Sequence, residues 1–297
     1  MIYTLGESLL DIIIEDLNHA STHPGGAMLN AAISLQRNRL QTSLISELGN
    51  DKAGKLILDF LTNEHVNTQY ITVYTDSETS LAIAFLDKKK KPEYTFKKCY
   101  PKIRKLPPPP DFTNNDFLLF GSLYSLDSNL YPQINLYLQK AKQAGATIIY
   151  DPNIRLAEKI KNPRLKKILF RNISIADIIK GSDEDFNAIF PGKPIQELNE
   201  EFLKINPEAL FIITQGEKGA SAFYEKKIFH EIAKPVKTIS TVGAGDGFNA
   251  GIIAYMQNNN ITFPISKENI LSMLKNGNKF ASDVCSSQEN YIPLKSK

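Results

Sequence analysis

Short, fully apolar segments alternate with amphipathic segments through most of the chain. In the second half, residues 147–150, 177–179 and 210–214 are apolar runs, and each follows a segment with helical spacing of apolar positions. The three segments with helical spacing are 130–144, 164–172 and 200–204. Apolar runs of this length predict strands buried on both faces, and helices between them predict a parallel sheet with crossovers. We therefore expect an α/β protein.

Polar clusters come directly after these predicted strands. They are Asp151–Arg155, Lys180–Asp185 and Gln215–Gly219. In open α/β sheets, ligands bind outside the carboxyl ends of the strands. The clusters therefore predict the edge of the sheet that carries the site.

The first half has a second pattern. We predict strands at 1–6, 42–48, 70–74 and 116–120, a turn at His23–Gly26 and a helix over 27–40. Residues 80–86 and 94–100 flank the basic run Lys88–Lys91 and predict a hairpin whose tip is solvated. Leu106–Pro110 reads as a stiff linker that returns the chain to its main body. The closing segments are predicted as an antiparallel pair, 221–224 and 228–232, and two helices, 246–256 and 267–284.

Gly49–Lys55 matches most of a phosphate-binding P-loop, but the next residue is Leu56, which has no hydroxyl for magnesium. Asn50 or Asp51 instead predicts a helix N-cap. The buried stripe of that helix is expected to be Leu56, Ile57, Phe60 and Leu61.

Composition is ordinary for a globular protein, with 297 residues, 42% hydrophobic and 23% charged. A net charge of +3 is too small to favour nucleic acid as a partner, and the two cysteines have no metal-like or disulfide-like spacing. The start of the chain has no basic region typical of a secretory signal, and no apolar run reaches the ~20 residues that span a bilayer. We expect a cytoplasmic protein with neither nucleic-acid nor membrane partners.

Small residues are concentrated in Ser240–Gly251, which reads as a tight turn opening into a helix. A helix start offers unpaired N–H groups and a partial positive charge, and glycines let an anion approach the backbone. Asp246 lies in this first turn. It is either a helix-stabilising acid or a general base, and the segment alone leaves both interpretations open.

Two segments together resemble the PfkB, or ribokinase-like, family of sugar kinases. Gly25–Ala32 (GGAMLNAA) resembles the family's glycine-glycine sugar-binding motif, and Thr241–Gly251 (TVGAGDGFNAG) resembles its catalytic signature. The similarity extends essentially from end to end. It implies a three-layer α/β/α sandwich with a mostly parallel central sheet and a small β-sheet lid. The core is then expected at 1–10, 25–75 and 105–297, and the lid at 11–24 and 76–104.

The resemblance implies phosphoryl transfer from ATP, with Mg²⁺, to a sugar hydroxyl. Asp246 then takes the hydroxyl proton, while the backbone N–H groups of Gly243, Ala244 and Gly245 hold the phosphoryl charge. Arg155, in a cluster similar to the Asp-x-Asn-x-Arg of fructokinases and ketodeoxygluconate kinases, is expected near the phosphate or the sugar; a surface salt bridge is the alternative.

Further positions carry over by the same resemblance. Asp11, Gly25, Gly26 and Asn30 match positions that bind sugar hydroxyls. The lid aromatics Tyr94 and Phe96 pack either on the sugar or only on the lid's own partner sheet. The nucleotide side is expected to include Lys180, Ser182, Thr214, Gly216, Gly219, Gly245 and Asn278.

Three departures from the family pattern concern metal ions. Ser182 and Asp185 stand where the family has Asn and Glu in its magnesium-organising motif, so Asp185 is expected to reach the metal through water. Ser240 replaces an acid that helps to shape a monovalent-cation site, so potassium activation is not carried over.

Fructose is the leading substrate by this resemblance, and ketodeoxygluconate, ribose or another small sugar stays open. A catalytically silent sugar-binding relative is the rival from another class, because Ser182 and Ser240 are weakened positions. A homodimer through the lids is a further expectation.

Overall fold

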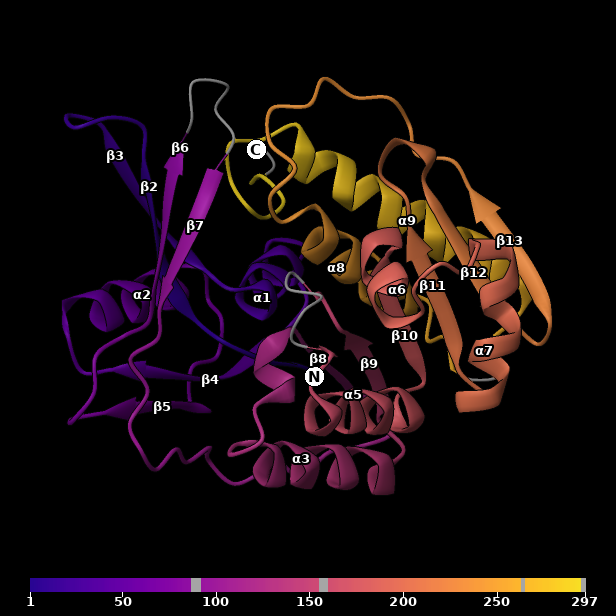
Figure 1. Cartoon of the computed structure of the whole chain (residues 1–297), viewed down its shortest axis with the longest axis horizontal. Coiled ribbons are helices and arrows are strands. Elements are labelled where there is room, and N and C mark those ends of the chain that lie inside the picture. The colour runs from indigo at the N-terminus through magenta and orange to yellow at the C-terminus, as the bar shows by residue number, and fades with distance from the viewer. Residues whose placement is uncertain (87–91, 155–159, 263–264, 295–297) are drawn as a thin grey trace.

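The computed structural model describes residues 1–86, 92–154, 160–262 and 265–294 (Figure 1). Within these ranges, a nine-stranded sheet has the order β13-β12-β11-β10-β9-β8-β1-β4-β5. Its strands are β1 (Ile2–Leu5), β4 (Thr42–Gly49), β5 (Ile71–Tyr74), β8 (Phe117–Gly121), β9 (Thr147–Asp151), β10 (Ile178–Ser182), β11 (Leu210–Thr214), β12 (Ala220–Tyr224) and β13 (Lys227–Glu231). All neighbours are parallel except β11–β12 and β12–β13. The prediction of a mostly parallel central sheet is confirmed.

Helices cover both faces of this sheet, because alternate residues of each strand point to opposite sides. Ile2 of β1 belongs to one buried core and Tyr3 to the other. The first core contains side chains of α1 (Ala27–Arg37), α2 (Lys52–Asn63), α8 (Ala244–Asn258) and α9 (Lys267–Cys285). The second contains side chains of α3 (Tyr131–Ala144), α5 (Pro163–Ile175), α6 (Asp183–Ile189) and α7 (Leu198–Ile205).

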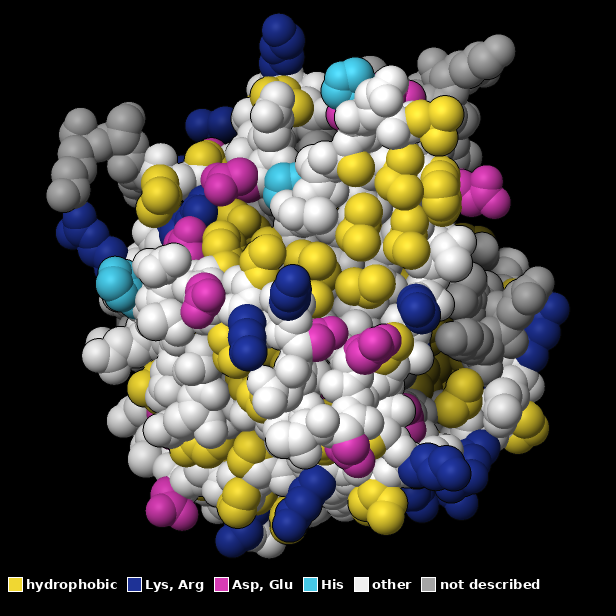
Figure 2. Space-filling model, turned by 90° about the vertical axis from the view of Figure 1, so that its left-hand side faces the viewer, with side chains coloured by type: hydrophobic (Ala, Val, Ile, Leu, Met, Phe, Trp, Pro, Cys, Tyr) yellow, Lys and Arg dark blue, Asp and Glu magenta, His cyan; other side chains and the backbone are white. Residues whose placement is uncertain are grey.

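A separate four-stranded sheet stands on the left in Figure 1 and has the order β3-β2-β6-β7. Its strands are β2 (Leu9–Ile14), β3 (Ala20–Gly25), β6 (Leu81–Leu86) and β7 (Pro92–Lys97). The predicted hairpin is confirmed, since β6 and β7 pair antiparallel. Figure 2 shows hydrophobic side chains gathered on the side of the molecule that carries this small sheet.

Three local predictions need correction. His23–Gly26 was expected to be a turn, but residues through Gly25 form an edge strand, where Pro24 is tolerated because one side of the strand needs no N–H donor. Leu56 is 46% exposed, because Ile57 and Leu61, four residues apart, form the buried face of α2. The Lys180–Asp185 cluster was expected to follow the strand at 177–179, but it contains the end of β10 and the start of α6.

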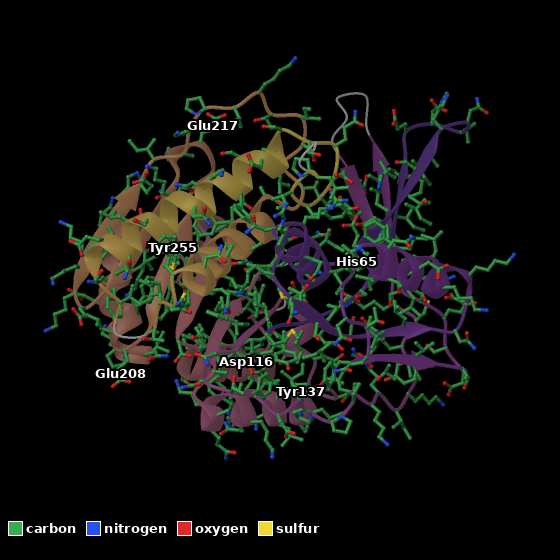
Figure 3. All side chains as sticks on the ribbon, turned by 180° about the vertical axis from the view of Figure 1, so that it is seen from behind. His65, Asp116, Tyr137, Glu208, Glu217 and Tyr255 are labelled. Carbon is green, nitrogen blue, oxygen red and sulfur yellow. The ribbon has the colours of Figure 1, made fainter. Side chains whose placement is uncertain are left out.

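Other local predictions are confirmed. Asp51 is the N-cap of α2, and its carboxylate accepts the Gly54 N–H at 2.8 Å, so Gly49–Lys55 is a helix start. The closing helices α8 and α9 pack together, and the Tyr255 hydroxyl donates across them to Asn269 at 3.1 Å (Figure 3). Within the described residues, no helix is long and apolar enough to cross a membrane.

Candidate active site

The two signature segments meet at the start of α8. The Asn30 side chain, from the first turns of α1, donates to Asp246 Oδ2 at 2.9 Å, although the residues are 216 positions apart. Asp246 is only 4% exposed and Asn30 only 5%. The Asn30 amide therefore orients the carboxylate of Asp246, the predicted general base.

Glycines shape the turn before α8. Gly243 is the N-cap, in the left-handed conformation with φ 80°, and a Cβ there would lie 2.0 Å from the Asn290 carbonyl oxygen. Ala244 donates its N–H to Thr241 O at 3.2 Å, so it would have to leave this bond to bind an anion. Gly245 lies in the first helical turn, where N–H groups have no intrahelical acceptor. The anion-binding role of these residues stays a prediction.

A buried ion pair lies beside this turn. Lys180 Nζ, on β10, donates to Asp151 Oδ2 at 3.0 Å, and Asn249 donates to the same oxygen at 2.6 Å. A Cβ added to Gly245 would lie 2.9 Å from Lys180 Nζ, so the ammonium touches the start of α8. A cation at the positive end of a helix dipole is unfavourable by itself. The Asp151 carboxylate offsets this cost, and the ammonium lies where an anion at the start of α8 would also meet it.

The burial and pairing of Lys180 and Asp151 determine their protonation. Burial alone would lower the pKa of the Lys180 ammonium, but the Asp151 carboxylate raises it above its usual value, so the group stays charged. Burial raises the pKa of the Asp151 carboxyl, and Lys180 opposes that rise. Among the described side chains, Asp151 Oδ1, Asn249 Oδ1 and Asn30 Oδ1 are buried acceptors without a donor. Such atoms are costly unless water or substrate satisfies them.

A cavity of about 580 Å³ lies between the small sheet and the core. Its described lining is Glu7, Leu9, Asp11, Gly26, Ala27, Met28, Asn30, Tyr94, Phe96, Lys98, Ser122, Leu123, Asn153 and Val242. Gly25 and Gly26 must be glycines because other groups approach their Cα atoms closely. A Cβ on Gly25 would lie 2.1 Å from Asp11 Oδ2, and one on Gly26 would lie 2.1 Å from the Glu7 carbonyl oxygen. The structure thus brings Asp11, Gly26 and Asn30 to one cavity.

Glu7 is a cavity residue that sequence reasoning missed. Its carboxylate accepts from the Tyr100 hydroxyl at 2.5 Å and pairs with Lys98 Nζ at 3.2 Å. The available signal was its position, one residue after the glycine that ends the first predicted strand. The pairing of Asp151 with Asn249 was also missed. The available signal was that Asn249 is three residues after Asp246 and so lies on the same face of the helix.

The aromatic lid residues lie on the cavity side of the small sheet. Tyr94 and Phe96 stack with ring centroids 5.8 Å apart, and both line the cavity. Phe96 remains 43% exposed. A half-open apolar ring beside carboxylates and amides suits the C–H face of a sugar while polar groups bind its hydroxyls.

Two strained residues mark the carboxyl ends of β8 and β9. Ser122 has φ 56° and Asn153 has φ 41°, and the Asn153 amide donates to Ser122 Oγ at 3.4 Å. Non-glycine residues rarely adopt positive φ, and such strain is concentrated at ligand sites. Both side chains line the cavity. Arg155, two residues later, lies outside the described residues.

Ser182 and Asp185 form the capping box of α6. Asp185 Oδ2 accepts the N–H and the hydroxyl of Ser182, both at 2.7 Å, while Oδ1 accepts the Ile154 N–H at 2.5 Å. Within the described residues, no group of three or more His, Cys, Asp or Glu side chains could enclose a metal ion. Protein groups hold both carboxylate oxygens of Asp185, and its contact with magnesium through water stays a prediction.

The remaining residues predicted for the nucleotide side lie at the ends of β11 and β13. Thr214 Oγ1 donates to Gly181 O at 3.4 Å, and Gly216 has φ 57° in open space. A Cβ on Gly219 would lie 2.1 Å from the Glu231 carbonyl oxygen. The Asn278 amide donates to that same oxygen at 2.9 Å, so Asn278 supports the end of β13 and is 8% exposed.

Ser240 takes part in a local network of protein groups. Its Oγ accepts the Val242 N–H at 3.2 Å, and the carbonyl oxygen of Cys285 accepts the N–H groups of Ile239 at 2.7 Å and Ser240 at 3.3 Å. The Cys285 oxygen is therefore already engaged by the protein. A hydroxyl also supplies no negative charge for a cation at this position.

Comparisons with known proteins identify the family of the chain. The family model described as "pfkB family carbohydrate kinase" matches residues 2–297. The fructokinase of Klebsiella pneumoniae is 28% identical over 264 residues, covering 85% of this chain and 83% of that protein. The fructokinase of Vibrio cholerae O395, solved with fructose, ADP and calcium, has a TM-score of 0.84 at 23% identity and covers 97% of this chain and 94% of its own.

A further solved structure extends the range of substrates seen on this fold. The aminoimidazole riboside kinase of Salmonella enterica, complexed with aminoimidazole riboside and an ATP analogue, has a TM-score of 0.82 at 19% identity, covering 97% of this chain and 94% of its own. The match to the family model extends over nearly the entire chain. The chain belongs to the pfkB family of carbohydrate kinases, phosphotransferases that act on a sugar hydroxyl.

Proposed function

We propose that this protein transfers the γ-phosphoryl group of ATP to a hydroxyl of fructose, with Asp246 as the general base. The observation that carries the proposal is the hydrogen bond between Asn30 and Asp246, which joins the sugar-side and phosphate-side signatures. The fructokinase relatives and the ligands of the solved neighbours support the choice of fructose and ATP.

The proposed reaction depends mainly on positioning and electrostatics. Asp246 accepts the proton of the attacking hydroxyl, and Asn30, which lines the cavity, orients its carboxylate. The Gly245 N–H and the Lys180 ammonium face the charge that develops on the transferred group. Asp185, through water, and Asp151 Oδ1 are the candidate oxygens for a magnesium ion bound with ATP, which would neutralise phosphate charge.

The charge of the cavity supports a neutral sugar over a sugar acid. Its described lining contains two acids, Glu7 and Asp11, and one cation, Lys98, which gives 1 − 2 = −1. Lys98 is already paired with Glu7. A ketodeoxygluconate carboxylate would therefore meet net repulsion, whereas the hydroxyls of fructose would find acceptors.

An ATP-consumption screen over ketoses, aldoses, sugar acids and nucleosides tests the proposal. We expect the largest kcat/KM for fructose. The kcat/KM for the sugar acids should be at least tenfold lower, a difference of about 1.4 kcal/mol. Turnover with no sugar by the native protein would contradict the kinase assignment and favour a silent sugar-binding relative. Preference for a sugar acid would leave the reaction class intact and overturn the substrate.

We also propose a homodimer through the small sheets. Ile12, Ile83 and Phe85 alternate with the cavity-facing residues and form an apolar outer face, on which Phe85 is 51% exposed. A second copy would cover this face. Light scattering should give twice the monomer mass for the native protein and the monomer mass for Phe85→Glu. A native monomer at high concentration would contradict the dimer.

A further inference from the structure

A buried arginine lies at the far end of the helix that carries Asn30. Arg37 is the last residue of α1, and its side chain is only 4% exposed. The guanidinium donates to both oxygens of Glu64 at 2.9 and 2.6 Å and to both oxygens of Glu289 at 2.6 and 3.1 Å. A fifth bond reaches Ile292 O at 3.0 Å. All five of its N–H donors are therefore used.

Arg37 thereby fixes the segment that follows α9, residues 286–292, which we call the C-terminal strap. Tyr291 stacks on the guanidinium, with the Arg37 Cζ atom 4.6 Å from its ring centroid. The Ile292 N–H donates to Ser34 Oγ, on α1, at 3.2 Å. Attraction to Glu64 and Glu289 raises the Arg37 pKa against the effect of burial, so the clamp stays charged.

The strap lies directly behind the catalytic turn. The carbonyl oxygen, carbonyl carbon and Cα of Asn290 lie 2.0, 2.7 and 3.0 Å from where a Cβ on Gly243 would be. The backbone of the strap is thus in contact with the N-cap of α8, three residues before Asp246. Where the strap begins, the carbonyl oxygen of Cys285 binds the Ile239 and Ser240 N–H groups.

Helix α1 is consequently joined to the catalytic helix at both ends. Asn30 bonds to Asp246 near its start, and Arg37 holds the strap against Gly243 near its end. Seven residues of helix separate the two joints, or about 10 Å at 1.5 Å per residue. A rigid rod fixed at both points sets the base and the anion-binding turn relative to each other.

We infer that Arg37 is a positioning residue for phosphoryl transfer, acting through Glu289 and the strap on the Gly243–Gly245 turn. The inference deepens the proposed kinase function and rests on it. Neither Arg37 nor the strap belongs to the described lining of the sugar cavity. Its loss should therefore affect the chemical step more than sugar binding.

The chain offers a matched pair of variants for the test. Glu289→Gln weakens the side of the clamp that holds the strap, whereas Glu64→Gln makes the same chemical change on the side that faces α2. The Glu64 side chain is 14% exposed and that of Glu289 41% exposed, so a purely structural role predicts the larger damage from Glu64→Gln. A positioning role predicts the opposite order for kcat.

We expect Glu289→Gln to lower kcat on the order of tenfold with little change in the KM for the sugar, because complete loss of one oxyanion donor costs ~10²–10³-fold. Glu64→Gln should keep kcat within about twofold while lowering Tm at least as much. A native kcat for Glu289→Gln, or an equal kcat loss in Glu64→Gln, would overturn the inference.

Hydrogen exchange separates this inference from the proposed function, since it needs no turnover. Peptides covering 240–247 should exchange at least several-fold faster in Glu289→Gln and at the native rate in Glu64→Gln. Unchanged exchange in Glu289→Gln refutes the positioning role whatever the substrate screen shows. Faster exchange in an inactive native protein would support the clamp and reject the kinase proposal.

Discussion

The phosphate side and the sugar side of the site are built differently. On the phosphate side, Asp246, Asp151 and Lys180 are each at most 4% exposed and make hydrogen bonds or ion pairs between segments of the core. On the sugar side, Phe96 is 43% exposed and Lys98 is also largely open to solvent. Under the proposed function, the chemistry belongs to the buried core and substrate selection to the more exposed small sheet.

Changes in a buried, paired site leave charges or acceptors without partners, which costs far more than the loss of a half-exposed contact. We therefore expect substitutions on the phosphate side to reduce kcat and substitutions on the sugar side to raise KM.

The largest effect is expected for Asp246→Asn. The amide keeps the shape of the side chain but cannot accept the hydroxyl proton, so kcat should fall ~10²–10⁴-fold. Steady-state kinetics with fructose and ATP would measure the loss, and an unchanged KM would show that the site is intact. If Asp246→Asn kept most of the native rate, the base assignment would be wrong.

Lys180→Met should give the next largest effect. It leaves the Asp151 carboxylate buried without its cation, so the free energy of unfolding should fall by about 3–5 kcal/mol and kcat by ~10²-fold. The control Lys142→Met breaks the surface pair with Asp177, where Lys142 is 52% exposed, and should cost at most ~1 kcal/mol with native kcat.

A double variant separates stability from catalysis at this pair. Asp151→Asn with Lys180→Met removes both charges and should recover much of the stability without recovering kcat.

The raised pKa of Lys180 adds a pH test. Its stabilising charge is fully present below the usual lysine pKa and is lost only as pH rises through the higher folded value, so between about pH 6 and 9 the native rate should show no step from Lys180.

A smaller effect is expected on the sugar side. Phe96→Ala should raise the KM for fructose about tenfold and change kcat little, because the ring contributes the same contact before and during transfer. Phe85→Ala is the control, since Phe85 is 51% exposed on the opposite face of the small sheet. Its KM should stay native once an unchanged molar mass has been verified. If Phe96→Ala lost as much kcat as Lys180→Met, the proposed difference between the two sides would be wrong.

The smallest effect concerns monovalent cations. Ser240 supplies a hydroxyl where a carboxylate would attract a cation, and the Cys285 carbonyl oxygen already binds two N–H groups. Rates in potassium, sodium and tetramethylammonium buffers of equal ionic strength should therefore agree within about twofold, since the screening of charge is the same. Strong activation by potassium would show that the turn is not held by protein groups alone.

Local sequence determined most of the secondary structure and one half of the site. Buried strands and amphipathic helices have characteristic periods, so β9, β10, β11, α8 and α9 were predictable from apolar spacing. The small residues of the turn and Asp246 were also readable, because a close backbone approach permits few residue types. The strand at Ala20–Gly25 was not, since Pro and Gly favour turns locally and only pairing with β2 stabilises it.

Tertiary structure decided which distant residues became partners. No local pattern links Asn30 to Asp246 or Lys180 to Asp151, because each pair depends on how helices and strands pack. Packing likewise brought Asp185 Oδ1 to the Ile154 N–H, and it joined Arg37 to Glu289 across 252 positions. The sequence alone determined that an acid, the proposed base, follows a glycine-rich turn. The fold decided which groups orient that acid and hold that turn.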